Sequence, residues 1–313
     1  MQSTIKIGTR ESELAMWQAN LVKSMLEDRG FATKLVPVTS MGDQDLITPL
    51  YQMGVQGIFT KSLDVALLNK RIDIAVHSMK DVPTTLPQGI VQAAVLARGN
   101  YEDILVPQTD DQNVEHSLQQ TNSHNVIIAT SSTRRRAQWL HKYPLHQITN
   151  IRGNVNTRLA KLSEAQWTGA IFAAAGLERL GRRPHNALAL HWMLPAPSQG
   201  AICIASLASN TEALHAAGLL NDANTNYCTS IEKTILGILM GGCTTPIGAL
   251  ATLHGNEVHV QANILSLDGS KKVAFGDSFL KGAAEDIAGV VAAKMLAQGG
   301  KEIVEEIRNA QAI

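Results

Sequence analysis

Aromatic residues are scarce in this sequence: they make up 4% of its 313 residues, whereas hydrophobic residues of all kinds make up 45%. So few rings leave little for base stacking, and 27 basic against 27 acidic residues give no net charge to attract nucleic acid. No apolar run reaches the ~20 residues of a membrane-spanning helix, and residues 1–8 lack the apolar stretch of a signal peptide. We therefore expect a cytoplasmic globular protein that binds neither nucleic acid nor a membrane.

Cysteine is also rare, with three residues at Cys203, Cys228 and Cys243. Three cysteines cannot all pair, and the absence of a C-x-x-C spacing argues against a cysteine-built zinc site. The histidines show no metal-ligand spacing either, so we expect no metal site. Cys203 and Cys228 lie in apolar or helical patterns and are predicted to be buried. Cys243 differs because glycines and a proline surround it in residues 241–248, a loop that would leave its thiol accessible.

Short β-branched runs alternate with helical patterns along the first two-thirds of the chain, which is typical of α/β domains. The pattern predicts strands at 5–8, 34–39, 72–76, 126–129 and 169–174, with helices at 13–26, 59–69, 134–140 and near 177. From about residue 221 it predicts a helix at 229–239, strands at 247–253, 258–265 and 272–279, and a helix at 283–296. The sequence therefore predicts an α/β protein with a small C-terminal α+β domain.

Hydroxyl groups stand beside cations at three predicted strand ends, where ligands of α/β sheets bind. The residues concerned are Arg10, Ser12, Ser78, Lys80, Thr130, Ser131, Ser132, Arg134 and Arg135. Arg152, Arg158 and Arg179 extend the basic set. Each strand end alone could be an ordinary helix cap, but together they predict a cleft that binds a polyanionic small molecule. Asp81 is the one carboxylate in this set; it either neutralises Lys80 or faces a positive centre that develops during a reaction.

Several motifs in this order resemble the porphobilinogen deaminase (hydroxymethylbilane synthase) family. They are Ile-Gly-Thr-Arg-Glu-Ser (7–12), His-Ser-Met-Lys-Asp (77–81), Thr-Ser-Ser-Thr-Arg-Arg (130–135), Arg-Gly-Asn-Val-Asn-Thr-Arg (152–158), Gln-Gly-Ala (199–201) and Gly-Gly-Cys-Thr-Thr-Pro-Ile-Gly (241–248). The resemblance implies two lobes like those of periplasmic binding proteins and a third domain. The implied domains are residues 1–99 with 198–218, residues 100–197, and residues 219–313.

The same resemblance implies an enzyme of tetrapyrrole and haem biosynthesis. Four porphobilinogen molecules would condense, with loss of ammonia, onto a covalent dipyrromethane primer, and water would release hydroxymethylbilane. Cys243 would carry the primer through a thioether, and Asp81 would be the catalytic carboxylate. The residues implied to bind substrate and cofactor are Arg10, Ser12, Ser78, Lys80, Thr130, Ser131, Ser132, Arg134, Arg135, Arg152, Arg158, Arg179 and Gln199. The partner would be the small-molecule substrate, and we expect a monomer.

A few positions depart from the pattern of the family. Gln52 and Gln56 stand where lysines are usual, Met41 replaces an arginine, and Lys233 and Ser198 replace an arginine and a glycine. Because the residues assigned to chemistry are intact, we expect retained activity with weaker substrate capture. Two alternatives stay open: a slow divergent paralogue, and a non-catalytic two-lobe receptor that binds anions. A cysteine-nucleophile hydrolase is disfavoured because no persuasive Cys–His–Asn/Asp set is present.

Overall fold

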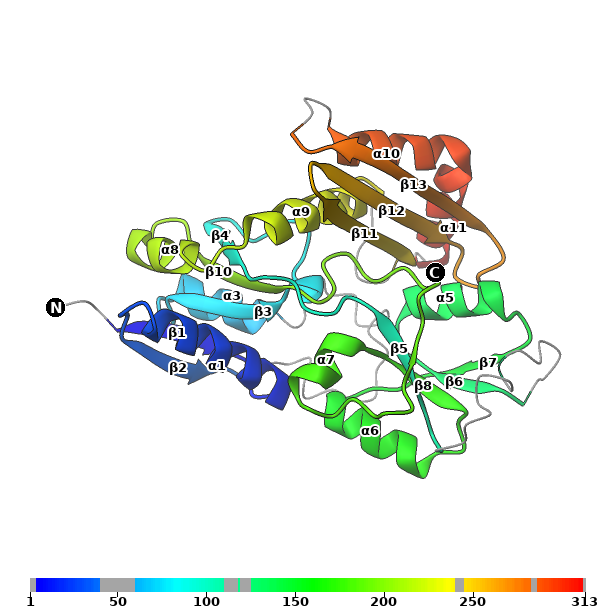
Figure 1. Cartoon of the computed structure of the whole chain (residues 1–313), viewed down its shortest axis with the longest axis horizontal. Coiled ribbons are helices and arrows are strands. Elements are labelled where there is room, and N and C mark those ends of the chain that lie inside the picture. The colour runs from blue at the N-terminus through cyan, green and yellow to red at the C-terminus, as the bar shows by residue number, and fades with distance from the viewer. Residues whose placement is uncertain are drawn as a thin grey trace.

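Three β-sheets organise the protein in a computed structural model that describes residues 4–39, 60–109, 118, 125–239, 245–282 and 286–311 (Figure 1). Two of the sheets have five strands and form two lobes, and the third has three strands and lies in the C-terminal part of the chain. The predicted fold class, two α/β lobes followed by a small α+β domain, is confirmed. The predicted domain boundaries stay a proposal.

The first lobe has a mixed sheet in the order β2-β1-β3-β10-β4. Its strands are β1 (Ile5–Thr9), β2 (Thr33–Pro37), β3 (Ile74–Ser78), β4 (Ile90–Val95) and β10 (Ile202–Leu207). Helices α1 (Glu13–Glu27) and α8 (Thr211–Gly218) pack on one face, and α3 (Lys61–Leu68) packs on the other. Both faces of this sheet are apolar and are covered by helices. Polar groups that bind a ligand are therefore expected at the ends of the strands.

The second lobe repeats this plan with the strand order β7-β6-β8-β5-β9. Its strands are β5 (Asp103–Pro107), β6 (Ile127–Ala129), β7 (Gln147–Thr149), β8 (Gly169–Ala173) and β9 (Leu188–Ala189), and its helices are α5 (Thr133–Lys142), α6 (Val155–Glu164) and α7 (Ala174–Arg179). In each sheet the first three strands are parallel and the last two alternate in direction. The end of β1 in one lobe therefore corresponds to the end of β6 in the other.

The third sheet is an antiparallel meander of β11 (Ile247–His254), β12 (Glu257–Leu265) and β13 (Lys272–Leu280). Helices α9 (Ala223–Ile238), α10 (Ile287–Met295) and α11 (Lys301–Gln311) bury their apolar side chains against it, and the short η3 turn (Leu296–Gly300) joins the last two. Figure 1 shows α9 reaching from the first lobe toward this sheet. One helix thus links the first lobe to the C-terminal domain.

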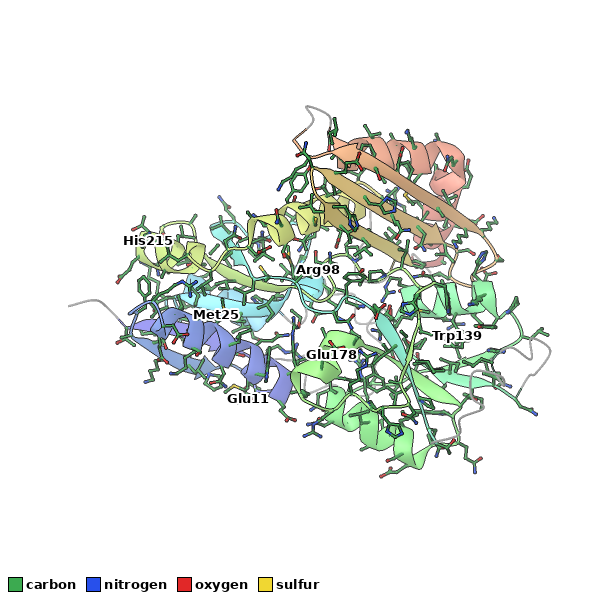
Figure 2. All side chains as sticks on the ribbon, viewed as in Figure 1. Glu11, Met25, Arg98, Trp139, Glu178 and His215 are labelled. Carbon is green, nitrogen blue, oxygen red and sulfur yellow. The ribbon has the colours of Figure 1, made fainter. Side chains whose placement is uncertain are left out.

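Two chain segments cross between the lobes, at residues 96–102 and 190–201. The two segments are in contact, because the Gly99 N–H donates to the Gly200 carbonyl at 3.1 Å. A β-carbon at Gly200, where φ is +89°, would lie 2.8 Å from the carbonyl oxygens of Gly99 and Asn100. Only glycine permits this approach. Figure 2 places Arg98 at this junction of the two lobes.

Candidate functional site

Asp81 lies just beyond the end of β3, in the single 3-10 turn η2 (Met79–Asp81). The Met79 side chain is buried. The Met79 backbone N–H donates at 3.0 Å to the carbonyl of Ala201, which lies in the crossing segment 190–201. The Val82 N–H then closes the turn on the Met79 carbonyl at 3.1 Å. These contacts place the half-buried Asp81 at the edge where the first lobe meets the crossover.

Asp103 is a residue of the site that the sequence analysis missed. Its carboxylate, which is fully buried, accepts hydrogen bonds from Arg134 at 2.7 Å, from Arg135 at 3.0 and 2.7 Å, and from Gln199 at 2.9 Å. Burial alone would raise the pKa of Asp103, but the two guanidinium groups and their hydrogen bonds hold that pKa well below its usual range. Asp103 therefore stays charged and fixes the orientation of both arginines.

Lys80 connects this arrangement to the first lobe. Its ammonium donates to the side-chain oxygen of Gln199 at 3.2 Å, and Gln199 in turn donates to Asp103. Burial and the nearby Arg135 lower the pKa of Lys80 to about 8, although Asp81 and Asp103 act in the opposite direction. A ligand carboxylate beside Lys80 would favour the charged ammonium, because a nearby opposite charge stabilises it.

Arg158 and Arg152 complete the group at the second lobe. Burial, together with repulsion from Arg135 and Arg152, lowers the pKa of Arg158 to about 10, and the charge of Asp81 partly opposes this. The Arg158 Nε–H donates to the Gly153 carbonyl at 2.8 Å, which orients the guanidinium at the start of α6. We call Lys80, Arg134, Arg135, Arg152 and Arg158 the basic cluster; its described carboxylate neighbours are Asp81 and Asp103.

The predicted hydroxyl residues shape the ends of the strands. Ser12 caps α1 by accepting from the Ala15 N–H, and Ser132 caps α5 by accepting from the Arg135 N–H. Ser131 bonds both the carbonyl and the N–H of Ile151. The other two predicted hydroxyls also bond within the protein. Ser78 pairs with the Gln18 side chain, and Thr130 accepts from the Ser132 N–H. In the described part of the chain these hydroxyls hold backbone and side chains in place.

The structure places Arg179 and Arg10 beside other partners. Arg179 donates to the Gly200 carbonyl at 2.6 Å and lies 5.8 Å over the ring of Trp17, so it braces the crossover. The charge of Arg10 acts on the buried His77 of β3. Their predicted roles in binding acid groups stay predictions.

Cys243, Gln52, Gln56 and Met41 lie outside the described residues, so their predicted roles stay predictions. The other two thiols are buried, as predicted. Burial raises the pKa of Cys203 to about 12 and that of Cys228 to about 11. Both thiols stay protonated at neutral pH, which makes them poor nucleophiles.

The basic cluster fits a molecule that carries several carboxylates. Its five cations face two carboxylates, and one of these, Asp103, is already engaged by Arg134 and Arg135. Each charge-assisted hydrogen bond to a ligand carboxylate would contribute about 1.5–3 kcal/mol. No side chain in the described part of the chain engages the Asp81 carboxylate by a hydrogen bond or an ion pair, so this carboxylate can face a cation on the ligand. The donor set therefore suits acidic groups on the ligand and a positive charge at the reacting atom.

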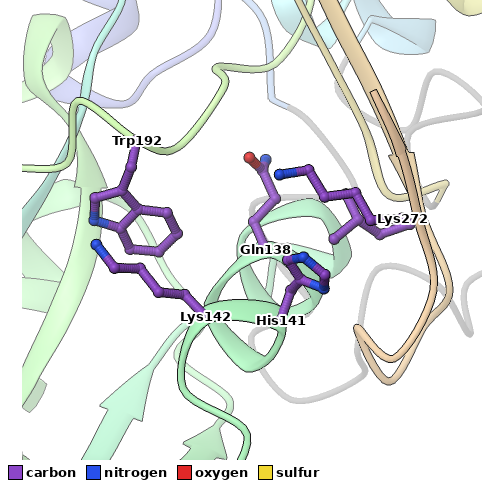
Figure 3. A pocket seen from close by; sticks show the side chains of 6 residues that line it. Gln138, His141, Lys142, Trp192 and Lys272 are labelled. Carbon is purple, nitrogen blue, oxygen red and sulfur yellow. The ribbon is translucent and has the colours of Figure 1, made fainter. Parts of the chain in front are cut away.

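A surface pocket of about 340 Å³ lies elsewhere, between α5 and the third sheet (Figure 3). Its lining residues are Gln138, His141, Lys142, Trp192, Leu265 and Lys272. His141 bonds the Gly269 carbonyl at 2.8 Å, and the Lys142 ammonium lies 4.5 Å over the Trp192 ring. The pocket marks the contact between the second lobe and the C-terminal domain and does not contain the basic cluster.

We expect Asp103→Asn to lower the free energy of unfolding by about 3–5 kcal/mol, because two buried guanidinium groups lose their counter-charge. Urea unfolding measures this change. The control is Glu178→Gln, which removes the carboxylate of the exposed Arg183–Glu178 ion pair and should cost less than about 1 kcal/mol. Equal losses in the two variants would contradict the role given to Asp103.

The buried His77 predicts a pH-dependent stability. Burial, with the charges of Arg10 and Lys233, lowers the pKa of His77 to about 4 from its ordinary 6.5. The unfolded chain therefore takes up the proton first. Stability from His77 is complete above pH 6.5 and is lost as the pH falls toward 4, with a total loss of about 3 kcal/mol.

Unfolding midpoints measured across this pH range test the prediction. His77→Gln should flatten the profile between the two pKa values, whereas His215→Gln, at an exposed histidine of α8, should leave its slope unchanged. An unchanged slope in His77→Gln would refute the assignment.

Among the described residues, no three His, Cys, Asp or Glu side chains gather in a way that could hold a metal ion. The described helices include none that combines the length and apolar character needed to cross a membrane.

Residues 5–215 match the family model "Porphobilinogen deaminase, dipyromethane cofactor binding domain", and residues 226–297 match "Porphobilinogen deaminase, C-terminal domain". A porphobilinogen deaminase of Pelobacter propionicus is 37% identical over 310 residues, which cover 97% of each chain. One of Moorella thermoacetica is 38% identical over 308 residues, covering 97% of this chain and 96% of that protein.

Among solved structures, an ancestral cationic amino acid solute binding protein aligns with a TM-score of 0.42 and 13% identity, over 69% of this chain and 87% of that one. A periplasmic domain of Bordetella pertussis BvgS aligns with a TM-score of 0.40 and 12% identity, over 69% of this chain and 86% of that one. At these low TM-scores, the fold assignment rests on the sheet topology itself.

Proposed function

The chain belongs to the porphobilinogen deaminase family, and from this premise we propose that it acts as a hydroxymethylbilane synthase in tetrapyrrole biosynthesis. Four porphobilinogen molecules condense, each with loss of ammonia, and water releases hydroxymethylbilane. This makes the protein a transferase that forms carbon–carbon bonds. The observation that carries the proposal is the Asp81 carboxylate, whose charge acts on Lys80 and Arg158 of the basic cluster.

The basic cluster binds the acetate and propionate groups of the substrate. Lys80 and Arg158 are the members of the cluster whose pKa values the charge of Asp81 raises. Arg134 and Arg135 donate to Asp103 and also to backbone carbonyls, so they contribute only the N–H groups that these contacts leave over. Gln199 fixes Lys80 between the two lobes.

Asp81 acts on the substrate after binding. When ammonia leaves, the substrate becomes a cation, and a fixed carboxylate stabilises it more than water does because the carboxylate needs no reorientation. The Asp81 carboxylate also accepts protons from the pyrrole N–H as the charge moves. The turn Met79–Asp81 keeps the carboxylate in place through the Met79 N–H contact with Ala201.

Cys243 would hold the dipyrromethane cofactor, and the chemistry that this group would supply when bound is a free pyrrole α-carbon as the nucleophile. Its acid groups match the cations of the second lobe, with Arg134, Arg135, Arg152 and Arg158 as their binding residues. The remaining predicted residues hold the strand ends and crossovers around this site in place by the contacts described above. They are Arg10, Ser12, Ser78, Thr130, Ser131, Ser132 and Arg179. We place the protein in the cytoplasm as a monomer, with the domain boundaries predicted from the sequence.

Product stoichiometry tests this function. Purified protein incubated with porphobilinogen should release four molecules of ammonia for each linear tetrapyrrole formed. A two-lobe receptor without chemistry would bind porphobilinogen and release no ammonia, and that result would refute the enzyme.

A further inference from the structure

The chain that follows Asp81 needs a partner from outside its own lobe. The η2 helix is one turn long, and its N-cap residue, Ser78, makes no side-chain cap hydrogen bond. Val82 leaves the turn in extended conformation, and Pro83 has no N–H to donate. The carbonyl groups of Val82 and Pro83 therefore depend on a donor supplied by another element.

Lys233 of α9 supplies that donor. Its half-buried ammonium donates to the Val82 carbonyl at 2.8 Å and to the Pro83 carbonyl at 3.0 Å. The same ammonium acts electrostatically on His77 and Cys203, which are neighbours across β3 and β10. Lys233 thus lies against the end of the sheet from which Asp81 projects.

The helix that carries Lys233 is itself firmly held. The adjacent Glu232 is fully buried, and its carboxylate accepts hydrogen bonds from the two terminal guanidinium nitrogens of Arg98 at 2.6 and 3.1 Å. It also accepts from the Ser198 N–H at 2.6 Å and from the Ala251 N–H at 2.8 Å. Two consecutive residues of α9 therefore hold both crossovers and the Asp81 segment.

We propose that Lys233 is a positioning residue for Asp81: it anchors the Val82–Pro83 segment to α9 and so fixes the direction in which the carboxylate points. The proposal rests on the proposed function for its catalytic consequence. Because α9 ends at Ile238, shortly before Cys243 in the chain, the same helix sets the position of Asp81 and the starting point of the cysteine segment. In this role Lys233 acts through the main-chain carbonyls of Val82 and Pro83 and not through a reacting atom.

Lys233→Met tests the anchor, with Lys233→Arg as the variant that restores two donors. Lys281→Met is the matched control, because the Lys281 ammonium binds Asn224 at 2.9 Å near the opposite end of the same helix. Hydrogen exchange of the peptide spanning residues 77–86 should become about tenfold faster in Lys233→Met. It should stay unchanged in Lys281→Met and in Lys233→Arg, and equal exchange in all variants would overturn the proposal.

Turnover supplies a second readout. Lys233→Met should lower kcat by about 10–10²-fold, as expected for a displaced catalytic group, with KM and the mass of the covalent adduct unchanged; Lys233→Arg should recover kcat. In an Asp81→Ala background the same substitution should change the residual kcat by less than about twofold. An undiminished loss there, or a raised KM with normal kcat, would overturn the role.

The exchange measurement separates the two proposals. It needs neither substrate nor cofactor, so the anchor can hold even if the wild-type protein forms no tetrapyrrole and the proposed function fails. If Lys233→Met does not fold, Lys233→Gln takes its place in both experiments, because its neutral amide is polar but places no ammonium at the two carbonyls.

Discussion

Asp81→Ala should reduce turnover by at least about 10²–10³-fold, the cost of removing one group that stabilises charge in a transition state. The carboxylate is the negative charge that stands free beside Lys80 and Arg158, whereas Asp103 is engaged by Arg134 and Arg135. The substrate cation would then lose this counter-charge, since the Asp103 carboxylate is already engaged by two arginines. Steady-state turnover of porphobilinogen measures the effect.

The fold should survive this change. Asp81 is half-buried, and the contacts that form its turn come from Met79 and Val82. The matched control is Asp277→Ala, which removes an exposed carboxylate on β13 and should leave turnover unchanged. Residual turnover in Asp81→Ala within tenfold of wild type would refute its catalytic role.

Cys243→Ser should abolish the covalent adduct completely, because a serine hydroxyl is a far weaker nucleophile than a thiolate. Intact mass spectrometry of the purified protein measures the adduct, and an aldehyde reagent for free-α pyrroles reports it as a pink colour. Turnover should be lost with the adduct, since no primer remains to be extended.

Cys228→Ser is the control for the cysteine prediction. Burial raises the pKa of the Cys228 thiol to about 11, so this residue is not expected to compete for the cofactor. The variant should keep the full mass of the adduct. An adduct that persists in Cys243→Ser, or disappears in Cys228→Ser alone, would contradict the assignment of the anchor.

The sequence alone predicted the layered fold because its apolar patterns are local. The helix predicted at 13–26 is observed at Glu13–Glu27, and the strand predicted at 258–265 is observed at Glu257–Leu265. The strand predicted at 72–76 lies at Ile74–Ser78, since Ile72 packs in the core before strand pairing begins. Strand β10 lies between β3 and β4 in the first sheet. It pairs with residues more than a hundred positions away in the sequence, and no local pattern reveals such pairing.

The sequence also singled out all five residues of the basic cluster, but not the carboxylate that orders two of them. Asp103 approaches Arg134 and Arg135 only through the folded chain. One signal was present: an aspartate begins the otherwise apolar strand Asp103–Pro107, and a buried carboxylate requires cationic partners. The sequence marked Lys233 only as a replacement of an arginine usual in the family, and it gave no signal for Glu232, because the partners of both are backbone groups or lie far along the chain.

The likeness of the two lobes explains why anion-binding groups collect between them. Ser12 at the end of β1 and Ser132 at the end of β6 cap equivalent helices, α1 and α5. Each cap leaves the start of its helix pointing at the same side of its sheet, where backbone N–H groups favour negative charge. In the proposed function, these two capped helix starts, together with Lys80 and the arginines, would bind molecules with several carboxylates.

A crystal structure of the purified, cofactor-loaded protein tests the central claim most directly. The account predicts a two-ring adduct on the Cys243 sulfur, with its acid groups on the basic cluster and its rings beside the Asp81 carboxylate. An Asp81 that lies far from Cys243 on another surface, with no space for two rings between them, would contradict it.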